Sequence, residues 1–148
     1  MQNYVRKRAT AILVKDHQIL LIRRVKPHEE YFMFPGGGVE EGETVEQGLL
    51  RESTEELAIK VDAFTPICVV ENIEIPPDKN TWIGDHKYYL FSIDKYSGTP
   101  EISGPEKEKM TEENQYHLVW VPIYQISSMK NLHPQEVAKA LVNYFNNS

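Results

Sequence analysis

The stretch from Gly37 to Glu56 contains residues whose types and spacing suit chemistry on a phosphate. After Gly37 come, in order, Glu43, Arg51, Glu52, Glu55 and Glu56. Glycines let a backbone approach a ligand closely. Carboxylates are the hard oxygen ligands that Mg²⁺ prefers, together with waters and substrate phosphates. An arginine held by Glu43 could orient the other three glutamates.

Residues 44–57 are predicted to form the helix that positions these glutamates. Thr44 to Gln47 matches a capping box, with Thr44 at the N-cap. One face of the helix is apolar, with a serine in its middle: Val45, Leu49, Leu50, Ser53 and Leu57. The three glutamates fall on the adjoining face, and we expect Glu55 and Glu56 to be exposed. A solvated acidic face is the simpler alternative, because like charges at i,i+4 cost only about 0.2–0.5 kcal/mol per pair.

Composition narrows the class of protein. The chain has 148 residues, 41% of them hydrophobic and 26% charged, which predicts one globular domain over residues 1–148. Cys68 is the only cysteine, so an intrachain disulfide and a cysteine zinc site are excluded, and we expect it to be an inert core residue. No apolar run reaches the length of a membrane span, and no apolar leader follows the first charges. We therefore expect a cytoplasmic protein with no membrane partner.

Charge is distributed unevenly along the chain. The net charge is −6, a poor basis for stable nucleic-acid binding. Residues 1–26 carry seven basic side chains and one acidic one, whereas residues 29–56 carry nine glutamates and one arginine. The second stretch therefore tolerates, or needs, concentrated negative charge.

Strands and helices are expected to alternate irregularly, which predicts an α/β protein with a mixed sheet packed between helices. A turn at Asp16-His17 and a break at 35–38 are expected, with a short apolar segment at 31–34. The strands expected are 9–14, 18–25, an interrupted 60–75, 87–94 and 117–121. A polar loop is expected at 97–114 and a closing helix at 134–145.

The spacing from Gly37 to Ile59 resembles the Nudix hydrolase signature, G-x5-E-x7-R-E-U-x-E-E-x-G-U, where U is a bulky aliphatic residue. All six of its glycine and charged positions up to Glu56 match, and Phe32 to Gly37 is similar to the usual entry to it. Ser53 stands where a bulky aliphatic is usual, and we expect it to weaken packing or to bond back to a helix carbonyl. Ala58 replaces the last glycine, which we expect to tighten the helix exit.

The resemblance implies a Nudix-type α/β/α sandwich with a mixed β-sheet and assigns roles within the signature. Glu52, Glu55 and Glu56 would be ligands of Mg²⁺, or of Mn²⁺ as a substitute, with the Gly36 carbonyl as an extra ligand. Glu55 and Glu56 would be catalytic through that metal, supported by the pair Glu43 and Arg51. The expected substrate-binding residues are Gly37, Gly38, Arg23 and Arg8.

Outside the signature, the resemblance implies a general base or added ligand in the loop before His117. Glu113 is the first choice, and Glu106, Glu108 and Glu112 are alternatives. Arg6 and Arg24 are further candidates to meet phosphates, and only one of the adjacent Arg23 and Arg24 should face the site. Trp82 is the best candidate to stack on a base.

The implied activity is Mg²⁺-dependent hydrolysis of a pyrophosphate bond in a nucleoside diphosphate derivative, by attack of water on phosphorus. The substrate would be a small nucleotide, with a slight lean towards nucleoside triphosphates or nucleotide sugars. The first alternative is a catalytically weak or inactive domain that senses a nucleotide. The second is an isomerase, which would need His and Cys ligands that the sequence does not supply. Dimers are common in the family, so a homodimer is an alternative to a monomer.

Overall fold

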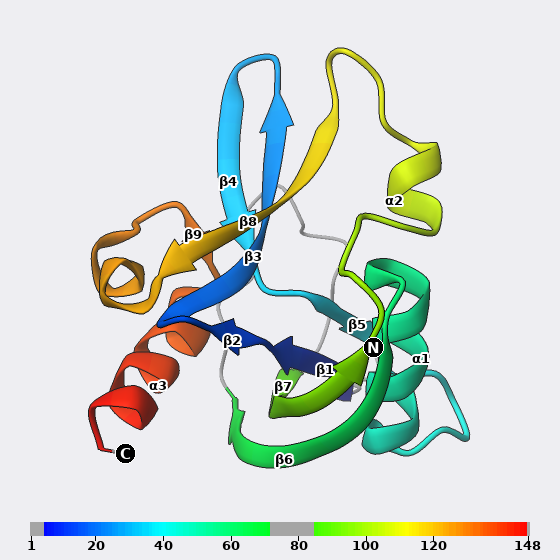
Figure 1. Ribbon diagram of the computed structural model, residues 1–148, viewed down its shortest axis with the longest axis vertical. Helices are drawn as coiled ribbons and strands as arrows, with labels where there is room; N and C mark the ends of the chain where they lie inside the picture. The colour runs from blue at the N-terminus through cyan, green and yellow to red at the C-terminus, as the bar shows by residue number, and fades with distance from the viewer. Residues whose placement is uncertain (1–4, 72–84, 148) are drawn as a thin grey trace.

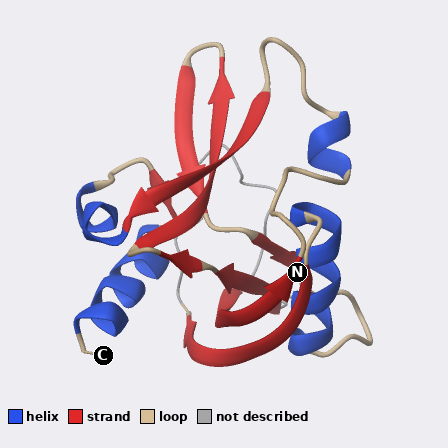
Figure 2. Cartoon of the chain, in the orientation of Figure 1, coloured by secondary structure: helices blue, strands red, loops and turns tan. Residues whose placement is uncertain are grey.

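The computed structural model describes residues 5–71 and 85–147 and consists of two mixed β-sheets with helices on either side (Figures 1 and 2). The strands are β1 (Val5–Ile12), β2 (Val14–Lys15), β3 (Gln18–Lys26), β4 (Glu29–Met33), β5 (Gly36–Gly38), β6 (Lys60–Val70), β7 (Asp85–Ser97), β8 (Gln115–Pro122) and β9 (Leu132–His133). The helices are α1 (Val45–Leu57), α2 (Pro105–Glu108), α3 (Gln135–Asn146) and a 3₁₀ helix (Ile123–Ser128). None of the helices in the described stretches is long and apolar enough to cross a membrane.

The first sheet has the strand order β5-β1-β7-β6. β1 is parallel to β7 and antiparallel to β5, so the short β5 lies at one edge. β6 lies at the other edge, antiparallel to β7, with register shifts that include one between Pro66 and Cys68. The second sheet has the order β2-β3-β4-β9, and β8 also pairs with β3.

Two groups of buried side chains fill the spaces between sheets and helices. The first core lies against α3 and contains Leu21, Leu132 and Leu141. The second core lies against α1 and contains Leu20, Leu49 and Leu57. Leu20 and Leu21 are neighbours on β3 and point to opposite cores, so the sheets separate α1 from α3 as Figure 1 shows. The predicted α/β/α layering is therefore confirmed, with the strands divided between two sheets instead of one.

Most predicted elements are present with modest changes of boundary. The capping box is confirmed, because Thr44 Oγ1 accepts a hydrogen bond from the Gln47 amide and Gln47 Oε1 accepts one from the Thr44 amide. The break expected at 35–38 is instead β5, and the loop expected at 97–114 contains α2. The predicted strand 60–75 ends at Val70 in the structure, and residues 72–75 lie outside the described residues.

The prediction that Cys68 is a core residue is wrong. Cys68 is exposed on β6. β6 is an edge strand, and the register shift next to Cys68 breaks the simple alternation of its side chains. An apolar run in the sequence does not distinguish such a strand from a central one.

Ala58 and Ser53 are the two departures from the expected signature, and the structure shows the surroundings of each. Ala58 ends α1 in the left-handed conformation, with φ 56° and ψ 32°. Glycine adopts this conformation without steric cost, whereas alanine is strained in it. The prediction that Ala58 only tightens the helix exit did not include this strain. Ser53 is 2% exposed and its hydroxyl has no hydrogen-bond partner, so the expected bond to a helix carbonyl is absent.

We predict that Ala58→Gly stabilises the protein. The left-handed conformation costs an L-residue about 1–2 kcal/mol, and the greater freedom of glycine in the unfolded chain offsets part of the gain. The expected net increase in the free energy of unfolding is up to about 1 kcal/mol, measured by urea denaturation. Ala58→Val is the matched control and should destabilise, because β-branched residues are rare at positive φ. Stabilisation by valine and not by glycine would contradict the interpretation.

Candidate functional site

Helix α1 lies beside β5 (Figure 1), and Glu52, Glu55 and Glu56 are in its second half. Leu49 and Leu57 are fully buried in the second core and fix the rotation of the helix. Its other side then faces the glycines of β5. The side chains of Glu52 and Glu56 consequently lie between the helix and the backbone of Gly36 and Gly37.

Arg51 is the centre of the polar network at this position. Its Nε and Nη2 donate to the two carboxylate oxygens of Glu43 at 2.9 and 3.0 Å. Nη2 also donates to the Gly38 carbonyl at 2.9 Å. Nη1 donates to Glu52 at 2.9 Å and to Glu55 at 3.1 Å. The pairing of Glu43 with Arg51 that the sequence predicts is thus present, and it connects the loop before α1 to the helix.

The electrostatics of the pair follow from these contacts. Hydrogen bonds from Arg51 and from the Glu40 amide lower the pKa of Glu43 to about 2. The same bonds raise the pKa of Arg51, so its charge is permanent. Burial raises the pKa of Glu52, and Arg51 opposes that rise. Arg51 therefore holds Glu43 and Glu52 in a fixed arrangement and partly neutralises a crowded acidic surface.

Glu56 lies in a different environment from the one predicted. It is 8% exposed, so the expectation that it sits on an open helix face is wrong, while the Glu55 side chain is 53% exposed as expected. Glu56 Oε1 accepts a hydrogen bond from the Gly36 amide at 3.3 Å. Burial, together with the negative charge of Glu106, raises the pKa of Glu56 to about 8. The backbone of β5 covers this carboxylate, a contact that helical periodicity alone does not reveal.

Two glycines of β5 are required by close approach. A Cβ at Gly37 would overlap the carboxylate of Glu52. A Cβ at Gly36, where φ is 141°, would overlap the Ala9 carbonyl oxygen on β1. The glycines therefore leave the space into which the Glu52 side chain fits, between α1 and β1.

The segment between β7 and β8 reaches the end of α1. The Glu101 and Ser103 amides each donate at 3.0 Å to carbonyls of the last helical turn, those of Leu57 and Glu56. Gly104 lies so close to the Glu55 carbonyl that a Cβ there would come within 2.7 Å of it. The next residues form α2 and bring Glu106 near enough to act on Glu56 electrostatically.

Glu113, the loop carboxylate ranked first from the sequence, lies elsewhere in this segment. It is exposed, and its amide donates to Thr111 Oγ1 at 3.3 Å in the turn before β8. Proximity in sequence to β8 gave Glu113 its rank. The contacts of the preceding residues with α1 instead favour Glu106, and no sequence pattern indicates those contacts.

The two arginines predicted to bind substrate differ in position. Arg8 lies on β1 opposite Gly38, packs over the Tyr88 ring at 5.5 Å, and acts electrostatically on both Glu52 and Glu56. Arg23 lies on β3 and pairs with Glu30 across the strand at 3.0 Å. The structure thus brings Arg8, and not Arg23, to the glutamates.

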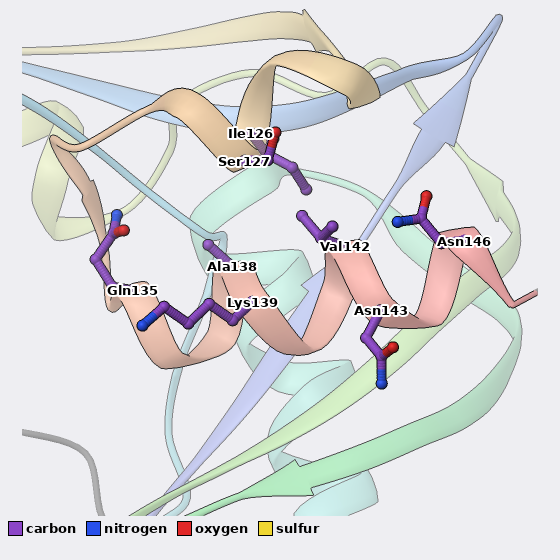
Figure 3. Close-up of a pocket in the computed structure, with 8 residues that line it drawn as sticks. All are labelled: Ile126, Ser127, Gln135, Ala138, Lys139, Val142, Asn143 and Asn146. Carbon is purple, nitrogen blue, oxygen red and sulfur yellow. The ribbon is translucent and has the colours of Figure 1, made fainter.

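The residue predicted to stack on a base, Trp82, lies outside the described residues. A pocket of about 240 Å³ between the 3₁₀ helix and α3 is lined by residues such as Ser127, Lys139 and Asn143 (Figure 3). It shares no residue with the glutamate network, so it is not part of this site.

The donor set suits a hard divalent cation. Glu52, Glu55 and Glu56 supply carboxylate oxygens within one stretch of α1, and the glycine backbone leaves room beside them. Within residues 5–71 and 85–147 no group of three His, Cys, Asp or Glu side chains is already arranged to hold an ion. The physical reason is that Arg51 binds Glu52 and Glu55 while Glu56 faces the Gly36 amide.

Comparisons with known proteins agree with this geometry. The family model of the NUDIX domain matches residues 5–142. The RNA pyrophosphohydrolase of Tolumonas auensis is 29% identical over 126 residues, covering 78% of this chain and 71% of that protein. The ADP-ribose pyrophosphatase of Methanocaldococcus jannaschii is 49% identical over 49 residues, covering 32% and 29%. The solution structure of the E. coli ORF135 protein has a TM-score of 0.74 at 21% identity, covering 98% and 94%, a likeness of fold.

We predict that Glu56 makes the stability of the metal-free protein depend on pH. Its folded pKa of about 8 lies above the unfolded value of 4.5, so the folded state binds the extra proton between these values. Stability therefore falls as pH rises through this window. Glu56→Gln has no such proton to lose, so its stability should not fall in this window. The free energy of unfolding of the variant minus that of the wild type should therefore be larger at about pH 8.5 than at about pH 5, by a few kcal/mol.

Urea denaturation in the presence of a chelator measures this difference. Glu55→Gln is the matched control, because its carboxylate is exposed on the same helical turn. The prediction is contradicted if the free energies of unfolding of the wild type and of Glu56→Gln differ by the same amount at both pH values. That result would show that the Glu56 carboxylate ionises freely.

Proposed function

Because the chain belongs to the Nudix hydrolase family, we propose that it hydrolyses a pyrophosphate bond in a nucleoside diphosphate derivative, in a reaction that depends on Mg²⁺. Water is the nucleophile, and the bond from phosphorus to the bridging oxygen breaks. The observation that carries the proposal is the Arg51 network, which fixes acidic oxygens beside a glycine backbone that a phosphate can approach.

Glu52, Glu55 and Glu56 are the residues we propose to hold Mg²⁺, with the Gly36 carbonyl as a further ligand and Mn²⁺ as a substitute ion. When bound, such an ion neutralises phosphate oxygens and lowers the pKa of a bound water. The residues fit this use because their carboxylates are hard ligands and one of them, Glu56, is shielded from bulk water. Arg51 positions Glu52 and Glu55 and is itself positioned by Glu43.

Arg8 and the glycine backbone are proposed to bind the substrate. Arg8 projects from β1 next to the glutamates, where its charge suits the phosphates. Gly38 has open space where a Cβ would be, so a pyrophosphate can approach its backbone closely. At Gly37 the Glu52 carboxylate occupies that space, so Gly37 is proposed only as a neighbouring backbone contact. Arg23 is less suited, because Glu30 already neutralises it.

A carboxylate of the segment before β8 is proposed to accept the proton of the attacking water or to serve as an additional ligand. Glu106 is better supported than Glu113, because Glu106 acts on Glu56 and the residues before it bond to α1. Its position gives the water a proton acceptor next to the glutamates.

The proposed substrate class is inferred from the family and from the names of its members. The relatives described above are named for RNA and for ADP-ribose, and both compounds contain a pyrophosphate or longer polyphosphate when they are substrates for such hydrolysis. We propose a small nucleotide as the substrate and a cytoplasmic location, consistent with a single cysteine.

A panel of phosphate compounds tests the function. We expect Mg²⁺- or Mn²⁺-dependent release of phosphate or pyrophosphate from at least one of nucleoside triphosphates, ADP-ribose, nucleotide sugars, dinucleoside polyphosphates or 5′-triphosphorylated RNA. Glu55→Gln should lower turnover by about two orders of magnitude or more while leaving the unfolding transition unchanged, because its side chain is exposed. Tight nucleotide binding with no turnover of any compound would favour the nucleotide-sensing alternative.

A second pair of variants identifies the loop carboxylate. Glu106→Gln should reduce kcat by at least about tenfold, since a positioned general base contributes about 10²–10⁴. Glu113→Gln is the matched control on the same segment and should retain kcat within about twofold. Steady-state kinetics on the best substrate of the panel measure both. A loss confined to Glu113→Gln would restore the assignment made from the sequence.

A further inference from the structure

Two adjacent arginines on β3 have opposite surroundings. Arg23 is exposed and its charge is neutralised by Glu30. Arg24 is partly buried, and none of the ion pairs found among the described residues includes it. Among residues 5–71 and 85–147, therefore, no carboxylate forms an ion pair with the Arg24 guanidinium.

Neutral groups hold Arg24 in place. Its Nη2 donates to Asn114 Oδ1 at 2.8 Å, and its guanidinium lies 4.4 Å from the centre of the Tyr116 ring. Tyr31 is its partner on the neighbouring strand, so the three side chains form a row across β4, β3 and β8. Burial raises the pKa of the Tyr31 phenol, and the charge of Arg24 opposes that rise. The guanidinium is thus fixed in orientation, and its remaining N–H groups are pre-organised.

The row of Tyr31, Arg24 and Tyr116 lies on the face of the sheet that α1 covers. Side chains alternate along a strand, so Arg24 shares a face of β3 with Leu20, which packs in the second core against α1. Tyr116 likewise shares a face of β8 with Leu118 and Trp120, which pack against the same core. The row therefore lies beyond the edge of the second core, on the side of the sheet where the glutamates are.

The row is also close, along the chain, to the glycine backbone that lies beside the glutamates. Tyr31 is five residues before Gly36, so the chain between them spans at most about 17 Å. A nucleotide whose pyrophosphate lies at Gly36 can therefore extend towards Arg24. Lys26 follows on the same face, 3.9 Å from Glu29 and 5.7 Å from the centre of the Tyr31 ring.

We propose that Arg24 binds a phosphate group of the substrate other than the pyrophosphate that is cleaved, an assignment that rests on the proposed function. A fixed guanidinium with spare donors matches two phosphate oxygens, and its charge is available because no carboxylate in the described part of the chain pairs with it. The preferred substrates are then nucleotides that carry a further phosphate on the ribose, either as a 3′-phosphate monoester or as the phosphodiester to a next nucleotide. Neutral contacts to Asn114 and Tyr116 hold the cation without competing for that anion.

Direct binding separates this proposal from the proposed function. Titration calorimetry in Mg²⁺ compares AMP, adenosine 3′,5′-bisphosphate and the dinucleotide pApA. The wild-type protein should bind at least one of the two compounds with the added phosphate about tenfold or more tightly than AMP. Arg24→Gln should abolish that preference while leaving the affinity for AMP within about twofold. Whichever of the two compounds shows the preference identifies the source of the phosphate.

Arg23→Gln is the matched control, because it removes the neighbouring positive charge, and it should retain the preference. Arg24→Lys keeps the charge but not the planar fork, and a partial loss is expected; it also carries the test if Arg24→Gln does not fold. The proposal is overturned if the wild-type protein shows no preference, if Arg24→Gln keeps it, or if Arg24→Gln weakens all three compounds equally. A protein that shows the preference but hydrolyses nothing would refute the proposed function and leave this phosphate site standing.

Discussion

The site depends on one guanidinium among carboxylates. Arg51 contacts Glu43, Glu52, Glu55 and the Gly38 carbonyl, so it joins the loop before α1, the helix and β5. Without that charge, the glutamates on one side of the helix would repel one another and turn outward. With it, the side chains of Glu52 and Glu55 are held in place by hydrogen bonds to one guanidinium. Glycine at position 37 then follows as a necessity, because the Glu52 carboxylate leaves no space for a side chain, while glycine at position 36 is required by the Ala9 carbonyl of β1.

Local patterns in the sequence were sufficient for the elements and for the composition of the site. The capping box fixed the start of α1, and the spacing of Glu43, Arg51 and Glu52 indicated their contacts. Both features depend on residues close in the chain, where helical geometry determines which side chains are in contact. The division of the strands into two sheets was not foreseeable, because pairing between distant strands leaves no local pattern.

The errors share a physical cause, which is contact between segments distant in sequence. Glu56 was expected on an open face, yet β5 covers it. Cys68 was expected inside, yet β6 is an edge strand. The choice between Glu113 and Glu106 stays a prediction, but distance along the chain was its only basis in the sequence, whereas Ser103 and its neighbours attach their segment to α1. Each case required knowledge of which backbone lies against which side chain.

The segment that joins β7 to β8 is tied down twice. Its first part is hydrogen-bonded to the end of α1, and Asn114 at its other end accepts a hydrogen bond from Arg24. The residues between Glu106 and Asn114, 107–113, are exposed and include only the end of the short α2. Such a segment can change in length and composition without moving the glutamates or the sheet, since both anchors lie outside it. The fold thereby separates a part that must stay constant from a neighbouring part that is free to diversify, and new substrate preferences can arise in the second at little cost to the first.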